Sequence, residues 1–237
     1  MTKFSISGYP KLIYFAQRHS DYNFQEFIKR WRKHAQLGIS MPRWENIYKY
    51  SHCDSYIEDA QSINTFSCDG VALVWYKNEN ARKRHVRDLK ARSIMQEDEK
   101  KTFAKPVSKV SLITNEYIFQ NSKSLNYKFF LCVWKKSRGD IKEIQNFWKT
   151  IFSDDLLNAL KNKYEKFGYV QNHVKLPIET LNSFDDCVCV DEINCEDIKL
   201  IDTLTKKIEK FLLLNKFLDK IDILCTNEKV LYNSVEN

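Results

Sequence analysis

Hydrophobic residues recur with a helical period most clearly in residues 23–38, NFQEFIKRWRKHAQLG. Apolar side chains return there every three or four positions, which is the spacing of one buried helix face. Asn23 can cap the first turn, with Glu26 reaching back three residues later, and Gly38 suits a left-handed stop. The pattern predicts an amphipathic helix with its apolar stripe against a core.

Other stretches have the patterns of strands, either alternating or continuously apolar. Residues 11–18, 41–52, 70–76 and 107–119 are the predicted strands, and 80–99 is a second, basic helix. Read in order, these elements follow a β-α-β-β-α-β sequence. This order is the ferredoxin-like motif.

The same pattern returns in the second half of the chain. Residues 12–31 align without a gap with residues 129–148. Both predicted helices then have the same capping arrangement and a tryptophan at the same place, Trp31 and Trp148. A long helix and a closing strand complete the second copy. These matches in order indicate a tandem repeat.

The repeat predicts the architecture. One ferredoxin-like unit covers a single face of its sheet with helices, so two fused copies would pack sheet against sheet. We therefore predict an α+β fold in which two tandem ferredoxin-like (βαββαβ) repeats, 1–120 and a degenerate copy at 127–237, form a pseudo-dimeric α+β barrel. Because the copies cover each other, either a monomer or a homodimer is expected.

The first copy resembles the EthD domain of the dimeric α+β barrel superfamily. The resemblance rests on FxxFIKRWRKHAQLG at 24–38, MPRWENIYKYSHCD at 41–54 and CDGVALVWY at 68–76. It covers residues 9–119 well and 127–232 only as a degenerate copy. The resemblance implies small-molecule chemistry, since the superfamily includes polyketide cyclases and dehydratases, cofactor-free monooxygenases and haem-handling enzymes.

Charge and cysteine content limit the partners. The net charge is +7, and its excess lies in the first half, densest at 81–92. That basic run spreads around most of a helix without an RNA-recognition motif, so we expect a solvated helix and no nucleic-acid partner. Seven cysteines without a CxxC pair indicate reduced thiols. With no membrane-length apolar run and no signal peptide, a cytoplasmic protein is expected.

His34 is the first candidate for chemistry. It lies seven residues after Phe27 and three after Trp31, so it falls on the apolar stripe. The repeat places Ile151 at the matching position, which suggests that plain packing could serve there. Two interpretations remain open: a structural histidine bonded to a backbone carbonyl, or a general acid/base in a pocket.

A second candidate group lies at the end of the predicted second strand. Tyr50, His52 and Asp54 share one strand face, because side chains alternate along a strand. Together with His34 they form the predicted catalytic set. The alternative is a strand end that exposes ordinary polar residues to water.

Large aromatic residues would provide the walls of an apolar cavity. Arg43 could meet a carboxylate or phenolate of a substrate, or could be a solvated surface residue. The predicted substrate-binding residues are Tyr14, Trp31, Arg43, Trp44, Tyr48 and Trp75. Core packing is the alternative for each aromatic.

These features predict a cofactor-independent enzyme acting on a small apolar or aromatic molecule by acid/base proton transfer. The expected reaction is cyclisation, dehydration or isomerisation, of lyase or cyclase type. No metal-ligand motif or nucleotide-binding loop occurs in the sequence, so no cofactor is predicted. The alternatives are a cofactor-free oxygenase, a haem-handling protein, or a protein that binds a small ligand without catalysis.

Overall fold

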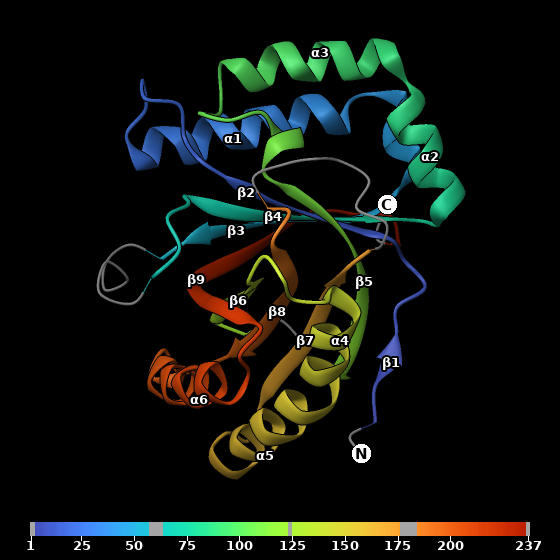
Figure 1. Ribbon diagram of the computed structural model, residues 1–237. Coiled ribbons are helices and arrows are strands. Elements are labelled where there is room, and N and C mark those ends of the chain that lie inside the picture. Colours follow the sequence, from blue (N-terminus) through green and yellow to red (C-terminus); the bar gives the residue numbers. More distant parts are fainter. Residues whose placement is uncertain (1–2, 57–63, 123–124, 176–183, 236–237) are drawn as a thin grey trace.

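The computed structural model describes residues 3–56, 64–122, 125–175 and 184–235. Within these residues, eight strands close into an antiparallel barrel, and the short β1 adds to its outside edge (Figure 1). The strands are β1 (Ser5–Ile6), β2 (Lys11–Ala16), β3 (Ile47–Ser55), β4 (Gly70–Tyr76), β5 (Ser111–Gln120), β6 (Tyr127–Lys135), β7 (Phe167–Val174), β8 (Cys187–Cys195) and β9 (Leu218–Asn233).

Helices lie outside the barrel. In Figure 1, α1, α2 and α3 cover the sheet of the first half, and α4, α5 and α6 cover that of the second. Their bounds are α1 (Phe24–Ile39), α2 (Glu79–Arg87), α3 (Leu89–Lys100), α4 (Ile141–Phe147), α5 (Ser153–Lys163) and α6 (Leu200–Leu214). Two 3₁₀ helices, η1 (Pro42–Asn46) and η3 (Val107–Lys109), and a π turn, η4 (Trp148–Phe152), complete the described helical segments.

The strand order around the barrel is β5-β2-β4-β3-β9-β6-β8-β7, and the pairing of the last strand, β7, with the first, β5, closes the barrel. The predicted α+β barrel is therefore confirmed. The halves meet along two hydrogen-bonded seams, β3 with β9 and β5 with β7. Sequence reasoning had predicted only packing of one sheet face against the other, because it had no information on which edges pair.

Helix α1 begins where the sequence predicts. The Asn23 side chain accepts from the Glu26 backbone N–H at 3.0 Å, and the Glu26 carboxylate accepts from the Asn23 N–H at 2.9 Å. Gly38 is not the predicted stop. The helix continues past it to a right-handed cap at Ser40. A Cβ at Gly38 would lie 3.0 Å from the Trp44 ring, so this glycine permits close packing.

Two other predictions needed correction. The predicted helix at 80–99 is two helices, because Asp88 leaves the helical conformation and its side chain accepts from the Ala91 N–H at 3.0 Å. The predicted strand at 41–52 begins with the 3₁₀ helix η1, whose first residue is Pro42. Proline suits a first helical turn and cannot donate to a sheet.

Alternation along the strands separates an interior core from two outer cores. On β2, Ile13 and Phe15 belong to the barrel interior, whereas Tyr14 and Ala16 pack under α1. The outer core of the second half is built around Trp148 and lies under α4, α5 and α6. Each half therefore has its own layer between sheet and helices, and both halves share the interior.

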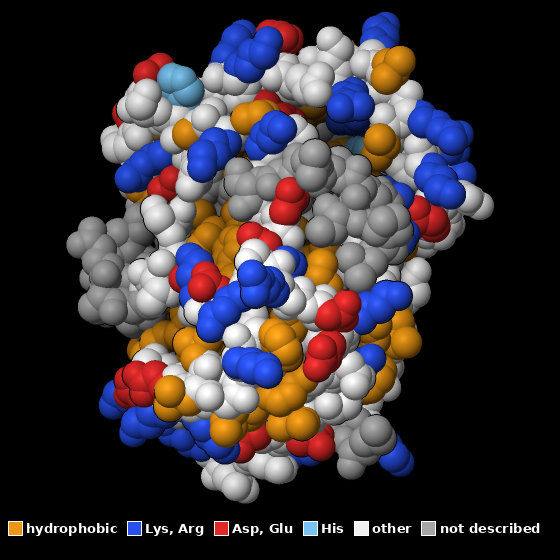
Figure 2. Space-filling model, in the orientation of Figure 1, with side chains coloured by type: hydrophobic (Ala, Val, Ile, Leu, Met, Phe, Trp, Pro, Cys, Tyr) orange, Lys and Arg blue, Asp and Glu red, His pale blue; other side chains and the backbone are white. Residues whose placement is uncertain are grey.

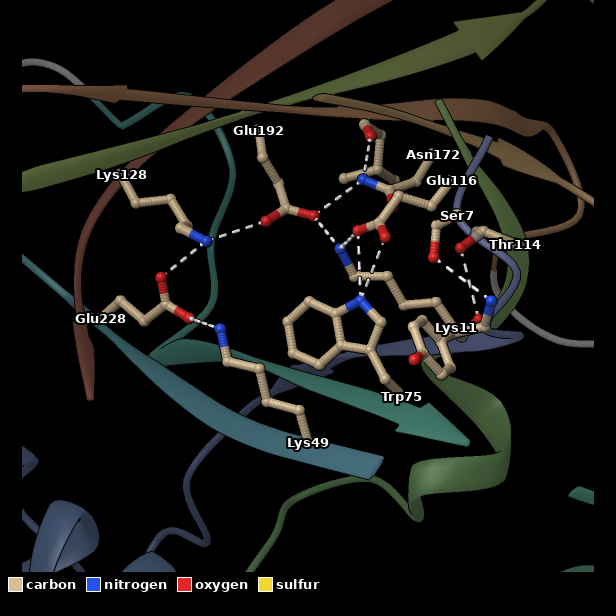
Figure 3. A network of polar contacts seen from close by, with 12 residues as sticks. Ser7, Lys11, Lys49, Trp75, Thr114, Glu116, Lys128, Asn172, Glu192 and Glu228 are labelled. Atoms are coloured by element: carbon tan, nitrogen blue, oxygen red, sulfur yellow. Dashed lines mark hydrogen bonds and ion pairs between the residues drawn. The ribbon is translucent and has the colours of Figure 1, made fainter. Parts of the chain in front are cut away.

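One part of the barrel interior carries charge (Figure 3). Lys11 is fully buried; its Nζ lies 2.7 Å from Glu116 Oε1 and also pairs with Glu192. Lys128 lies 2.9 Å from the other oxygen of Glu192 and 2.7 Å from Glu228. Burial alone would raise the pKa of Glu192, but the two lysines hold it well below its ordinary value. This network ties the halves together, since Lys11 and Glu192 come from different halves.

Candidate functional site

A pocket of about 250 Å³ lies on the outer face of the first half, between the sheet and the helices α2 and α3. Its apolar walls are Leu12, Val86, Met95, Val107 and Ile113. The polar residues that line it are Arg43, Arg82, His85, Arg92, Gln96, Glu99, Ser108 and Ser111. Lys and Arg side chains gather over α2, at the upper right of Figure 2. An apolar pocket with a few convergent polar groups is the usual form of a small-molecule site.

His85 is held in a single tautomer at this pocket. Its Nδ1 lies 3.2 Å from the Arg43 carbonyl oxygen, which can only accept, so Nδ1 carries the hydrogen. Burial, with Arg43 nearby, lowers the pKa of His85 to about 4, so the ring is neutral at pH 7. Nε2 is then left with its lone pair. The ring is held by edge contacts with Trp44 and Tyr76.

Arg43 brings an unpaired donor to the same place. It lies on η1, and its Nε is buried without a hydrogen-bond partner among the described residues. The indole Nε1–H of the neighbouring Trp44 is also buried without a hydrogen-bond partner among the described residues. Burial lowers the pKa of Arg43. Buried donors without partners cost free energy, on the order of 1–3 kcal/mol each, so a bound acceptor would be favoured here.

Behind the pocket runs a chain of hydrogen-bonded side chains. The Trp31 indole donates to the Tyr14 hydroxyl at 3.0 Å, and the Tyr14 and Tyr50 hydroxyls are 3.0 Å apart. Tyr50 lies 2.5 Å from His52 Nε2. Trp44 packs edge-on against Tyr50, with ring centres 5.2 Å apart. Trp44 therefore connects the pocket with this chain.

Arg32 determines which groups donate and which accept in this series of hydrogen-bonded side chains. A guanidinium can only donate, so His52 Nδ1 accepts from Arg32. Burial first, then Arg32, lowers the pKa of His52 well below its usual value. The neutral ring therefore carries its hydrogen on Nε2 and donates to Tyr50. Asp54 holds Arg32 in place at 2.6 and 2.5 Å. The structure thus brings Tyr50, His52 and Asp54 together on one face, although none of them lines the pocket.

His34 lies between α1 and α3. Its Nδ1 is 2.7 Å from Asp98, which also pairs with Arg30. Burial outweighs the effect of Asp98 and lowers the pKa of His34. Its partner is thus a carboxylate rather than the backbone carbonyl considered from the sequence. His34 does not line the 250 Å³ pocket.

The predicted pocket walls divide between two sides of the sheet. Tyr14, Trp31 and Trp44 belong to the outer core near the pocket. Trp75 faces the barrel interior, where its indole donates to Glu116 at 3.1 Å. Tyr48 stacks on Tyr9 at 4.1 Å between ring centres, also against the interior core.

The matching layer of the second half is filled by side chains. Phe152 stacks on Trp148 with ring centres 3.6 Å apart. Ile151, which the alignment places opposite His34, is 54% exposed. The expectation that Ile151 occupies the buried stripe is wrong, because the π turn η4 adds a residue to the helix here.

Sequence reasoning missed His85 as a pocket residue. It lies in the basic run at 81–92, which looked like a solvated helix on charge alone. One local signal in the sequence could have identified it: Ala81 and His85 are four residues apart and therefore share a helix face, and a small apolar residue such as alanine suits a buried face. In the structure, Ala81 is indeed fully buried.

Comparisons with known proteins give the fold. No family model matches the sequence, and no curated protein matches it significantly. An anthrone oxidase-like protein superposes with a TM-score of 0.59 at 6% identity, covering 96% of each chain. A mutant chlorite dismutase from Candidatus Nitrospira defluvii gives 0.54 at 10% identity, covering 94% of this chain and 93% of its own. A proposed monooxygenase from Fusobacterium nucleatum gives 0.51 at 11%, covering 96% and 95%.

These neighbours share the dimeric α+β barrel fold with this chain. They do not confirm the EthD assignment, and they contradict the predicted function. The main prediction was a lyase or cyclase type of proton-transfer enzyme. The neighbours are instead a monooxygenase, a chlorite dismutase and an anthrone oxidase-like protein. The prediction of a lyase or cyclase is therefore wrong.

Two further findings concern the described residues only. They contain no helix long and apolar enough to cross a membrane. They also contain no group of three or more His, Cys, Asp or Glu side chains arranged to hold a metal ion.

Proposed function

We propose that this chain is a cofactor-independent oxygenase that oxidises a small, electron-rich aromatic molecule bound beside His85 and Arg43. The observation that carries the proposal is the pairing of a proton acceptor with an anion-stabilising donor at one apolar pocket. His85 offers a free lone pair on Nε2, and Arg43 offers a buried, unpaired Nε–H. The oxygenase and oxidase names among the structural neighbours agree with this chemistry.

The reaction needs no electrons from outside. An aromatic ketone with an acidic CH₂ group loses a proton to give an anion that oxygen attacks. The net change is CH₂ + O₂ → C=O + H₂O, in which the carbon is oxidised and oxygen is reduced. His85 would take the proton, and Arg43 would stabilise the anion. Burial is the main cause of the depressed pKa of His85 and Arg43 the second; as negative charge develops next to Arg43, this second effect is partly cancelled, so the ring becomes a better base.

The residues around the pocket do not fit a haem. A cavity of ~150 Å³ is filled by one benzene molecule, and this pocket of about 250 Å³ has no room for a porphyrin. The haem-handling alternative is therefore not adopted for this pocket.

The remaining predicted site residues receive supporting roles in this proposal. Tyr14, Trp31, Tyr50, His52 and Asp54 would fix the position of Trp44 and hence the pocket wall. A direct role of His34 in proton transfer stays a prediction that competes with the role of His85.

We also infer that the halves, 1–120 and 127–237, are tandem ferredoxin-like repeats. The shared strand order supports this, since β5-β2-β4-β3 in the first half corresponds strand for strand, in the same direction around the barrel, to β9-β6-β8-β7 in the second. Superposition of the two halves would test it.

The test of function is oxygen uptake with anthrone as substrate, corrected for uncatalysed oxidation. His85→Gln keeps a polar side chain but removes the base, and should lower turnover about 10²- to 10⁴-fold with an unchanged melting temperature. His34→Ile should keep most of the activity, and the exposed Arg138→Gln serves as control. Loss of activity in His34→Ile but not in His85→Gln would favour the competing assignment. A wild-type rate equal to the uncatalysed rate, with anthrone and its hydroxylated derivatives alike, would refute the function.

A further inference from the structure

We infer that the natural ligand of this pocket carries a carboxylate on an aromatic body of two or three fused rings. The inference deepens the proposed function by naming a substrate class, and as a statement about substrate it rests on that function. It follows from an excess of positive charge around a small apolar volume.

Three guanidinium groups line the pocket, and they come from three elements. Arg43 lies on η1, Arg82 on α2 and Arg92 on α3. Arg82 is held by Glu79, with Nε 3.0 Å and NH2 2.6 Å from the same carboxylate oxygen. Within the described parts of the chain, no carboxylate oxygen lies within 4.0 Å of a guanidinium nitrogen of Arg43 or Arg92.

The acidic groups near these arginines have other partners. Glu99 lines the pocket but accepts the Val107 backbone N–H at 3.1 Å. Asp88 accepts the Ala91 N–H as the cap of α3. Both carboxylates bond to backbone N–H groups and act on Arg43 only from a distance, so neither occupies the hydrogen-bonding fork of its guanidinium, which can still pair with a ligand. A planar carboxylate matches the fork of a guanidinium and forms short, charge-assisted hydrogen bonds.

The size and shape of the pocket limit the rest of the ligand. Leu12 and Ile113 from the sheet and Met95 from α3 provide apolar contact. A volume of about 250 Å³ exceeds the ~150 Å³ that one benzene ring fills. Two or three fused rings with one small charged group fit this space. Arg92, which is exposed on α3, marks the solvent side from which an anion would enter.

The test is binding of 2-naphthoate compared with 2-naphthamide, its neutral isostere, by calorimetry with the full-length chain. Neither compound has an oxidisable CH₂ group, so binding is measured without turnover. We expect naphthoate to bind ~10-fold or more tightly than naphthamide, with the difference shrinking at high salt. Arg43→Gln should remove most of that preference, because it removes the charge and leaves a neutral hydrogen-bonding group. Arg92→Gln should weaken naphthoate binding less, because this side chain is exposed.

Arg138→Gln, a charge loss of the same size on an exposed loop, is the control for net charge. Equal binding of the two compounds, binding of neither, or equal losses in Arg43→Gln and Arg138→Gln would each overturn the inference. These outcomes are separable from failure of the proposed function. Oxygen uptake with neutral anthrone could persist while the carboxylate preference is absent, and the preference could persist in a protein without oxygenase activity.

Discussion

The outer faces of the two halves are built alike and differ in what lies under the helices. Each has a buried tryptophan, Trp31 on α1 and Trp148 on the π turn η4 that follows α4. In the first half, Trp31 donates to a tyrosine hydroxyl, and a pocket with His85 lies beside the same layer. In the second half, Trp148 donates to the carboxylate of Asp191, and aromatic rings fill the space. Both faces contain buried polar groups. In the first half, His85 lines a pocket, whereas Trp148 and Asp191 line none of the cavities found among the described residues of the second half.

The difference teaches that burial of polar side chains is not enough to indicate a site. Asp191 is fully buried and its pKa is raised to about 8, primarily by burial. Its hydrogen bonds come from Trp148 and Tyr169, and it lines none of the pockets described. By contrast, His85 has a perturbed pKa and also faces open volume. A perturbed group becomes a site candidate when a ligand can reach it.

The largest expected effect comes from the interior that both halves share. Lys11→Met removes the cation between Glu116 and Glu192 and should cost about 3–5 kcal/mol of unfolding free energy, because two buried carboxylates lose their partner. Urea denaturation measures this. Lys49→Met is the matched control: its Nζ is 3.7 Å from Glu228 and partly exposed, so about 0–1 kcal/mol is expected. Equal costs for the two variants would mean that the buried pairs of Lys11 contribute no more to stability than one partly exposed pair.

The second prediction concerns the filled layer of the second half. The pKa of Asp191 is raised to about 8 in the folded state, well above its unfolded value. Between about pH 4 and pH 8 the unfolded chain releases this proton while the folded chain keeps it, so stability falls as pH rises through that window. The loss from this group is at most about 6 kcal/mol. Asp191→Asn should flatten the dependence and stabilise the protein at pH 8.

Urea denaturation at pH 5 and pH 8 measures this prediction, with the exposed Asp219→Asn as control. Wild type and Asp219→Asn should show the same fall in stability between the two pH values. If Asp191→Asn shows that same fall, Asp191 is ionised in the folded protein and the contrast between the two halves weakens.

The smallest expected change in unfolding free energy is at Ile151, which is exposed, and it is compared with the change at its buried neighbour Phe152. Ile151→His should change the unfolding free energy by less than about 0.5 kcal/mol, because Ile151 is exposed on the π turn. Phe152→Ala should cost about 3–5 kcal/mol, since that ring stacks on Trp148 in the core. Thermal melts of the two variants suffice. A large loss of unfolding free energy in Ile151→His would mean that Ile151 is buried, as the ungapped alignment of the two helices predicts.

Local signals in the sequence were enough to predict much of the fold. The cap at Asn23 and Glu26 depends on neighbouring residues, and the strand at 70–76 on a continuous apolar run, so both could be located. The helix break at Asp88 could not, because a single side chain decides it against a favourable helical pattern. The seams β3–β9 and β5–β7 depend on distant pairing, which no local pattern encodes.

The candidate site was only partly predictable. Trp44 was predicted as one of the aromatic walls of a cavity, and Arg43 as a partner for a substrate carboxylate or phenolate; both lie at or beside the pocket. Trp75 could not be assigned to the correct side of the sheet, because a fully buried strand gives no alternation. His85 was hidden by charge, since its helix is basic on the exposed faces and buried only on a narrow one.

Closure of the barrel has a consequence for synthesis. Strand β3 ends at Ser55, and its partner β9 begins at Leu218. At a translation rate of ~5–20 residues per second, the interval between them is roughly ten to thirty seconds. During that time the edge of β3 has no strand to pair with, and free edges are where chains associate wrongly. The newly made first half therefore exposes an unpaired strand edge until β9 has been synthesised.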